Sequence, residues 1–188
     1  MKYLYHGSAN PDIEVLEARS VLHGSQQKVI YLTDNIPYAL YYIWDAEKIG
    51  YPGKHVTGWC KDGVAFYEEQ FLGQLEAFYS GVSGYLYCVN AENAKTVEGR
   101  EGLFYSTSDL PIEKKCFIAD VYQELLKYEA MGEFKVKRFI EQTSERQTEL
   151  IDLIAQAIKR ENCYADDKGH QEFMKKYFSE SWEKAVNG

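Results

Sequence analysis

The first residues whose types and spacing suit chemistry are Tyr5-His6-Gly7-Ser8, near the start of the 188-residue chain. An imidazole such as that of His6 can hydrogen-bond a ribose hydroxyl through one ring nitrogen. Gly7 has no side chain, so a planar amide can approach its backbone N–H and C=O groups. The run therefore suits contacts to a ribose and a carboxamide. The alternative, on these four residues alone, is a buried histidine before a turn.

A second group of candidate residues is aromatic. Tyr31 lies within the apolar run 29–33, and Tyr38 and Tyr42 follow it in the chain. Two rings on either side of a cleft can enclose a flat heterocycle. The alternative is that these rings only pack the core, because the chain contains 16 tyrosines.

These side chains need secondary structure to hold them. The pattern predicts strands at 2–6 and 29–33, and a helix at 38–48 that Asp34-Asn35 caps. Residues 12–19 fit a short helix or an extended turn. The other expected elements are a hairpin of strands 55–60 and 64–71 around Asp62-Gly63, a helix at 72–79, strands at 85–89, 103–105, 115–119 and 134–139, and helices at 121–131, 144–159 and 168–186.

Composition favours one α+β domain with a sizeable core, because 45% of the residues are hydrophobic. We expect residues 1–142 to carry the sheet and 143–188 to form a helical extension packed on it. The formal charge of -8 argues against a protein that coats nucleic-acid backbones. The four cysteines form no Cys-x-x-Cys pair, and we expect no metal, no membrane span and a cytoplasmic location.

Together, Tyr5-His6-Gly7-Ser8 and the segment from Val29 to Tyr42 resemble the ADP-ribosyltransferase superfamily, in the branch of diphtheria toxin and the poly-ADP-ribose polymerases. The resemblance covers about the first 45 residues well and the strand near 84–90 loosely. It implies a split antiparallel sheet that holds NAD. His6 would then contact a ribose, Gly7 would pair with the carboxamide, and Tyr31 and Tyr42 would flank the nicotinamide. Ser8 and Tyr38 complete the expected cofactor contacts.

The same family implies a glutamate at the start of a late strand. A carboxylate bonded to the ribose 2′-hydroxyl stabilises the cation that develops when the bond to nicotinamide breaks. We rank Glu69 first, because on a strand it shares a face with Ala65, Tyr67 and Phe71, which favour burial. The other candidates are Glu68, Glu101 and Glu113. With His6 and Tyr31, Glu69 completes the expected catalytic set.

The expected function is NAD-dependent transfer of ADP-ribose to a protein, nucleic-acid or small-molecule acceptor. The alternative is a non-catalytic module of the same fold that binds a nucleotide or a protein. A related activity, in which a phosphate moves from RNA to NAD, needs several clustered arginines, and the arginines of this chain are scattered along it.

Overall fold

The largest part of the fold is a seven-stranded sheet in which every pairing is antiparallel. The computed structural model describes residues 3–55, 57–165 and 168–188. The sheet has the order β11-β7-β1-β4-β9-β8, and β3 pairs with β4 at the side of this path. The strands are β1 (Tyr3–Ser8), β3 (Ser20–Val21), β4 (Lys28–Thr33), β7 (Gly84–Asn90), β8 (Lys95–Thr96), β9 (Leu103–Ser106) and β11 (Lys114–Ile118).

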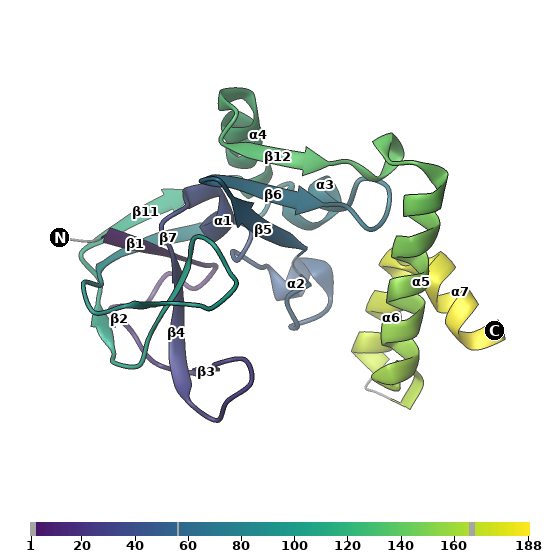
Figure 1. Ribbon diagram of the computed structural model, residues 1–188, viewed down its shortest axis with the longest axis horizontal. Helices are drawn as coiled ribbons and strands as arrows, with labels where there is room; N and C mark the ends of the chain where they lie inside the picture. The colour runs from purple at the N-terminus through teal and green to yellow at the C-terminus, as the bar shows by residue number, and fades with distance from the viewer. Residues whose placement is uncertain (1–2, 56, 166–167) are drawn as a thin grey trace.

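Two smaller sheets accompany it (Figure 1). One pairs β10 (Leu110–Pro111) with β2 (Val15–Leu16). The other joins β5 (Gly58–Lys61) antiparallel to β6 (Val64–Glu68), and β6 parallel to β12 (Phe134–Lys137). The turn between β5 and β6 is Asp62-Gly63, with positive φ at both residues, as a two-residue hairpin turn requires.

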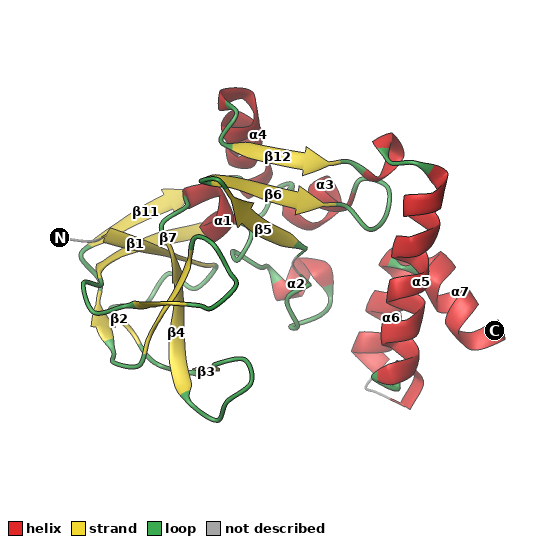
Figure 2. Cartoon of the chain, viewed as in Figure 1, coloured by secondary structure: helices red, strands yellow, loops and turns green. Residues whose placement is uncertain are grey.

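The helices gather on one side of the large sheet and at one end of the molecule. Figure 2 shows α5, α6 and α7 together at the end away from β1 and β4. The helices are α1 (Ile36–Leu40), α2 (Ala46–Ile49), α3 (Gln74–Tyr79), α4 (Val121–Met131), α5 (Ser144–Arg160), α6 (Lys168–Tyr177) and α7 (Ser179–Asn187), with 3-10 turns η1 (Phe139–Glu141) and η2 (Cys163–Ala165).

The large sheet separates two hydrophobic clusters. Leu4, Leu32 and Phe104 belong to the smaller one. Successive strand residues face opposite sides. Tyr5 and Leu103 accordingly pack against the larger cluster, which α1 and α4 share. The functional candidates on β1 and β4 therefore lie beside α1.

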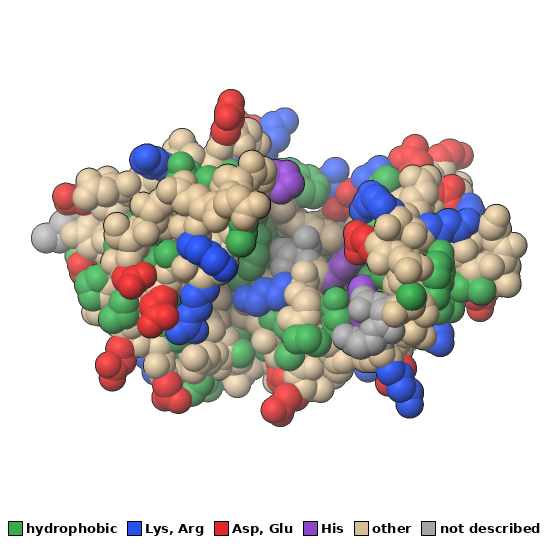
Figure 3. All heavy atoms as spheres, turned by 90° about the horizontal axis from the view of Figure 1, so that it is seen from below, with side chains coloured by type: hydrophobic (Ala, Val, Ile, Leu, Met, Phe, Trp, Pro, Cys, Tyr) green, Lys and Arg blue, Asp and Glu red, His purple; other side chains and the backbone are tan. Residues whose placement is uncertain are grey.

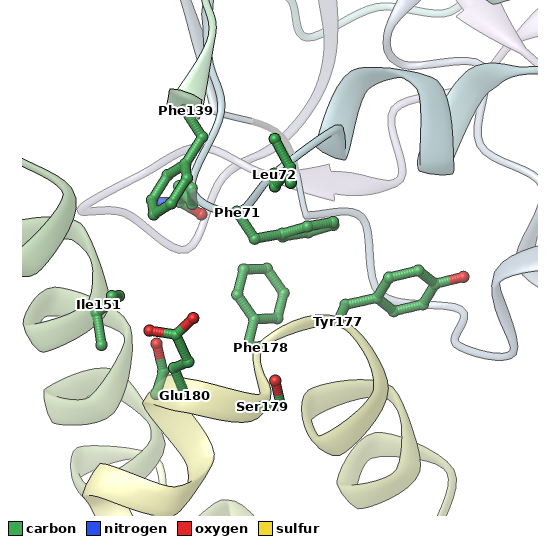
Figure 4. A pocket seen from close by; sticks show the side chains of 10 residues that line it. Phe71, Leu72, Phe139, Ile151, Tyr177, Phe178, Ser179 and Glu180 are labelled. Carbon is green, nitrogen blue, oxygen red and sulfur yellow. The ribbon is translucent and has the colours of Figure 1, made fainter. Parts of the chain in front are cut away.

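The three C-terminal helices join the larger cluster through aromatic contacts. The ring of Phe178, at the start of α7, meets the ring of Phe71 edge to face at 5.2 Å between centroids. Figure 4 shows these two rings together with Leu72, Phe139 and Ile151 around a small pocket of about 80 Å³. The helical extension thus shares a core with the rest of the chain.

The expected strands are present, but those expected at 64–71 and 134–139 already end at Glu68 and Lys137, so Glu69 follows its strand. Most of the expected helices are also present, but two of them are wrong. Residues 38–48 form α1 and α2 instead of one helix, because Asp45 starts a new one by accepting hydrogen bonds from Glu47 N and Lys48 N at 3.0 and 2.9 Å. Residues 168–186 are likewise divided into α6 and α7 at Phe178, whose backbone is non-helical.

Two further details differ from the sequence-based expectation. Of the two structures expected for residues 12–19, the extended one forms, and it includes strand β2. The cap of α5 is Thr143, whose hydroxyl accepts from Arg146 N at 3.3 Å, rather than Ser144-Glu145. Neither difference moves the residues proposed for the site.

Candidate functional site

The candidate site opens where β1 and β4 separate. These two strands share one register pair, Tyr5 with Thr33, whereas β1 pairs with β7 over its whole length. Beyond this pair, the ring of His6 bridges the gap, with its Nδ1 3.1 Å from the carbonyl oxygen of Tyr31. A side chain therefore replaces the next backbone contact between the strands, and the sheet is split at this point.

The split forms a cleft of about 250 Å³. It brings together most of the side chains that the sequence singled out, namely His6, Gly7, Tyr31, Tyr38 and Tyr42. β1 and β4 supply the first three, and α1 with the turn after it supplies the two remaining rings. The expectation that residues 2–8 and 29–33 are neighbouring strands lining one cleft is confirmed for the described residues 3–8 and 29–33.

The surroundings of His6 favour its neutral form. Burial is the main cause that lowers its pKa, and the nearby charge of Lys54 lowers it further, against the opposing hydrogen bond to Tyr31. A carbonyl oxygen only accepts, so the Nδ1 of His6 must carry the proton and donate. Its Nε2 is then an acceptor, which is the role needed to receive a hydrogen bond from a hydroxyl group.

The tyrosine rings of the cleft are held in place by their hydroxyls. Tyr31 Oη donates to the Val21 carbonyl at 3.2 Å and accepts from His23 N at 3.1 Å. The hydroxyls of Tyr38 and Tyr42 lie 3.4 Å apart, and their ring centroids lie 5.6 Å apart. Burial raises the pKa of both phenols, so they stay neutral. The walls of the cleft are thus aromatic and preorganised.

Gly7 lines the cleft, and packing also requires it. A Cβ atom at this position would lie 2.0 Å from the carbonyl oxygen of Ala39 and 3.1 Å from Cγ1 of Ile43. The end of α1 therefore rests directly on the backbone of β1. Close packing is thus a second reason for a glycine here, besides the access of a ligand to the backbone.

Two expected site residues lie outside the lining of the cleft. Ser8 Oγ accepts from Asn10 N at 3.2 Å and stabilises the turn after β1. Glu69 is 4% exposed, and its two carboxylate oxygens accept from Leu75 N at 3.1 Å and Phe139 N at 3.0 Å. The expected burial of Glu69 is confirmed, but its partners are backbone amides of α3 and η1 rather than His6 or a ribose.

No carboxylate lines the cleft among the residues that the structure describes. At the start of β9, the strand next to β4, the side chain that lines the cleft is Leu103. Glu101 comes two residues earlier, and its Oε1 accepts from Gly63 N at 2.8 Å. The start of β9 thus presents an apolar side chain to the cleft and not a carboxylate.

Sequence reasoning missed Lys54 and Leu103, which also line the cleft. Lys54 comes from the loop between α2 and β5, and its Nζ donates to the Tyr42 carbonyl at 2.8 Å. No pattern in the sequence marks either residue, because only the packing of α1 against β1 and β4 brings these segments to one place.

Comparisons with known proteins add no family. No family model, curated protein or solved structure matches this chain. Within the described ranges, no helix has the length and apolar character needed to cross a membrane, and no three His, Cys, Asp or Glu side chains cluster in a way that could hold a metal ion. The function of this chain is therefore inferred from the geometry of the cleft.

The half-buried histidines His6 and His55 predict a stability that falls in mild acid. Burial lowers the pKa of both His6 and His55 below the ordinary value of 6.5. As pH falls through about 6.5, the unfolded chain binds these protons first, so the free energy of unfolding decreases until the pH passes the folded pKa. Urea unfolding at pH 7.5 and 5.5 measures this loss.

The variant His6→Asn measures how much of this loss of stability comes from His6. In His6→Asn a side-chain amide can still donate to the Tyr31 carbonyl, but nothing titrates there. We expect a smaller loss of stability between pH 7.5 and 5.5 than in the wild type. An identical pH dependence in both proteins would show that His6 takes up its proton equally in the folded and unfolded states.

Proposed function

We propose that this chain binds NAD in the cleft between β1 and β4, with the nicotinamide ring between tyrosines, as a module of ADP-ribosyltransferase-like architecture. The observation that carries the proposal is the convergence of His6, Gly7, Tyr31 and Tyr42 on one cleft at a split in an antiparallel sheet. The meeting of these residues from β1, β4 and the segment around α1 supports the proposal.

The chemistry of the lining suits one nicotinamide riboside unit. Neutral His6 offers an acceptor to a ribose hydroxyl through Nε2. Tyr31 and Tyr42 both line the cleft, and a flat ring stacks favourably on phenol rings. The volume of about 250 Å³ is just below the range of ~300–1,000 Å³ typical of small-molecule sites. The cleft therefore encloses one heterocycle and its ribose, and the rest of a dinucleotide extends out of it.

The residues that line the cleft favour binding of NAD without transfer of ADP-ribose. Cleavage of the bond between ribose and nicotinamide builds positive charge on the sugar, and a carboxylate next to it lowers the barrier. Glu69 is held by the backbone amides of Leu75 and Phe139, and Leu103 occupies the start of β9. A cleft lined in this way holds the ligand and supplies no group to stabilise that charge.

Removing one ring from the cleft tests the binding role. In Tyr42→Ala we expect NAD to bind roughly 5- to 150-fold more weakly, because stacking of a base on an aromatic side chain contributes ~1–3 kcal/mol. Tyr42→Phe keeps the ring and should bind nearly as well as the wild type. Isothermal titration calorimetry measures the dissociation constants.

A matched control lies in the helical extension. Tyr164 is 39% exposed and its ring contacts Trp182, so Tyr164→Ala removes a tyrosine far in sequence from the cleft. We expect it to leave NAD binding unchanged. Equal heats for the wild type and Tyr42→Ala, or no binding of NAD at all, would contradict the proposal.

The second candidate function is ADP-ribosyl transfer itself, and the position of Glu101 favours it. Glu101 is exposed two residues before Leu103, and only its Oε1 is used in the contact with Gly63 N. The same titration samples distinguish the two functions. The binding module returns NAD intact, whereas a transferase releases nicotinamide at a rate that falls on the order of 10²-fold in Glu101→Gln.

A further inference from the structure

The small sheet of β5, β6 and β12 has one face that points away from the core. Its inward side chains, such as Tyr67 and Phe134, belong to the larger hydrophobic cluster. Because successive strand residues face opposite sides, Trp59 and Phe66 point outward, and both are half-buried. The register places Phe66 between Trp59 and Lys135. The outward face therefore carries a row of two aromatic rings and a lysine across three strands.

The two rings stack on each other, and lysines lie over them. The ring planes of Trp59 and Phe66 are 4° apart, with 5.4 Å between the centroids. Lys137 Nζ lies 5.0 Å from the centroid of Trp59, and Lys135 Nζ lies 5.8 Å from that of Phe66. Both lysines are exposed, and a cation over a ring at an exposed site is held weakly. A phosphate can therefore draw the ammonium groups toward itself and leave ring surface to a base.

The charge of the small sheet is opposite to that of the whole chain. The chain has 29 Asp and Glu residues against 21 Lys and Arg. Its three strands instead carry one carboxylate, Glu68, and three lysines, namely Lys61, Lys135 and Lys137. Glu68 accepts from Arg146 Nη2 at 2.8 Å and lies 3.9 Å from Lys137 Nζ, so cations compensate its charge. The acids Asp62 and Glu133 lie in the turns before β6 and β12, outside the strands.

The rest of the surface carries mixed charge. Figure 3 views the molecule from the side away from β6 and β12 in Figure 1, and Asp and Glu side chains are spread over that face among Lys and Arg. The excess of positive charge on the small sheet is therefore local. With a formal charge of -8, the chain as a whole repels a long polyanion. The ligand that complements this face is a short anionic segment that also offers flat rings.

Single-stranded nucleic acid has both properties. Its phosphates carry negative charge, and its unpaired bases stack on aromatic side chains, whereas a duplex keeps its bases stacked inside. We propose that the outward face of β5, β6 and β12 binds a short stretch of single-stranded nucleic acid. A base stacks on the pair of Trp59 and Phe66, and phosphates bind Lys135 and Lys137. This site is separate from the cleft proposed for NAD, because none of these four residues lines it.

The salt dependence of binding tests the role of the lysines. For single strands, each cation that neutralises a phosphate adds about 0.7 to the slope with which the logarithm of the binding constant falls against the logarithm of salt concentration. We expect Lys135→Gln with Lys137→Gln to bind fluorescein-labelled oligothymidylate more weakly and to reduce this slope by about 1.4, twice the value for one cation. Fluorescence anisotropy at several salt concentrations measures both quantities. An unchanged slope would overturn the contacts to phosphate.

Replacing Trp59 tests the stacking. In Trp59→Leu we expect oligothymidylate to bind roughly 5- to 150-fold more weakly, whereas Trp59→Phe keeps a ring and should lose less. Fluorescence of the wild type decides the matter if Trp59→Leu does not fold. Oligothymidylate should quench tryptophan emission in the wild type but not in Trp59→Phe, in which Trp44 and Trp182 remain. Equal quenching in both proteins would exclude a base on Trp59.

A matched control pair of lysines lies on α6. The Nζ atoms of Lys175 and Lys176 lie 5.0 Å from the centroid of Trp182 and 4.6 Å from that of Tyr177. Lys175→Gln with Lys176→Gln makes the same change of charge beside rings that belong to no sheet. We expect it to leave both the affinity for oligothymidylate and the salt slope as in the wild type. An equal loss in this variant would mean that net charge alone governs binding.

Other ligands separate this face from a general anion site and from the cleft. Polyglutamate and duplex DNA should bind the wild type more weakly than oligothymidylate does. Equal or tighter binding of polyglutamate would assign the face to acidic peptides instead, and tighter binding of the duplex would exclude base stacking. The Lys135→Gln, Lys137→Gln variant should bind NAD like the wild type, so failure of either site is seen without the other. A wild type that does not bind oligothymidylate would overturn the proposal and leave NAD binding untouched.

Discussion

Replacing Glu69 by alanine is expected to lower the free energy of unfolding by about 2–6 kcal/mol, because two backbone amides lose the acceptor that this carboxylate provides. The carboxylate of Glu69 accepts from Leu75 N in α3 and from Phe139 N in η1, and the residue is 4% exposed. Its removal leaves the buried amide of Leu75 and the half-buried amide of Phe139 without acceptors, at about 1–3 kcal/mol each. Urea unfolding at pH 7 measures the loss.

The effect is specific to the position of the carboxylate. Glu69→Gln keeps the shape and one acceptor oxygen but presents an NH₂ group to the second amide, so we expect a loss between those of alanine and the wild type. Glu98→Ala removes an exposed glutamate and should change stability by less than about 0.5 kcal/mol. Folded Glu69→Gln should also bind NAD like the wild type. A Glu69→Ala variant that is as stable as the wild type but binds NAD more weakly would show that Glu69 acts in ligand binding.

Local signals predicted much of the fold. The Asp62-Gly63 turn between β5 and β6 was predictable because both residues adopt positive φ, which few residue pairs tolerate. The helix at 121–131 was predictable from its spacing and from Gly132, which ends it in the left-handed conformation. The convergence of His6 and Tyr31 was predictable only through the resemblance, since no local pattern sets the pairing of distant strands.

The rest of the site depends on tertiary contacts that leave no local pattern. Strand alternation correctly predicted that Glu69 is buried, but it carries no information on what the carboxylate meets there. The carboxylate meets the backbone amides of Leu75 and Phe139, which belong to other elements. Lys54 likewise reaches the cleft only because Asp45 starts a second helix and turns the following loop toward Tyr42.

Gly7→Ala is expected to lower both stability and ligand binding. The new Cβ would lie 2.0 Å from the carbonyl oxygen of Ala39, which is much closer than van der Waals contact. This oxygen belongs to the backbone of α1. A backbone atom cannot rotate away as a flexible side chain can, so α1 must move from β1. Overpacking of this kind typically costs about 1–3 kcal/mol. The same movement displaces Tyr38 and Tyr42, which line the cleft.

The two consequences of Gly7→Ala are measured on one protein. Thermal unfolding reports the stability, and calorimetry with nicotinamide riboside at a temperature where the variant is folded reports the cleft. Ser8→Ala is the matched control on the next residue, because its hydroxyl accepts from Asn10 N in the turn after β1 and does not line the cleft. We expect Ser8→Ala to keep riboside affinity, and Gly7→Ala to lose at least as much of it as Tyr42→Ala. Wild-type affinity in Gly7→Ala would contradict this prediction. It would mean that the positions of the Tyr38 and Tyr42 rings do not depend on the contact between Gly7 and Ala39.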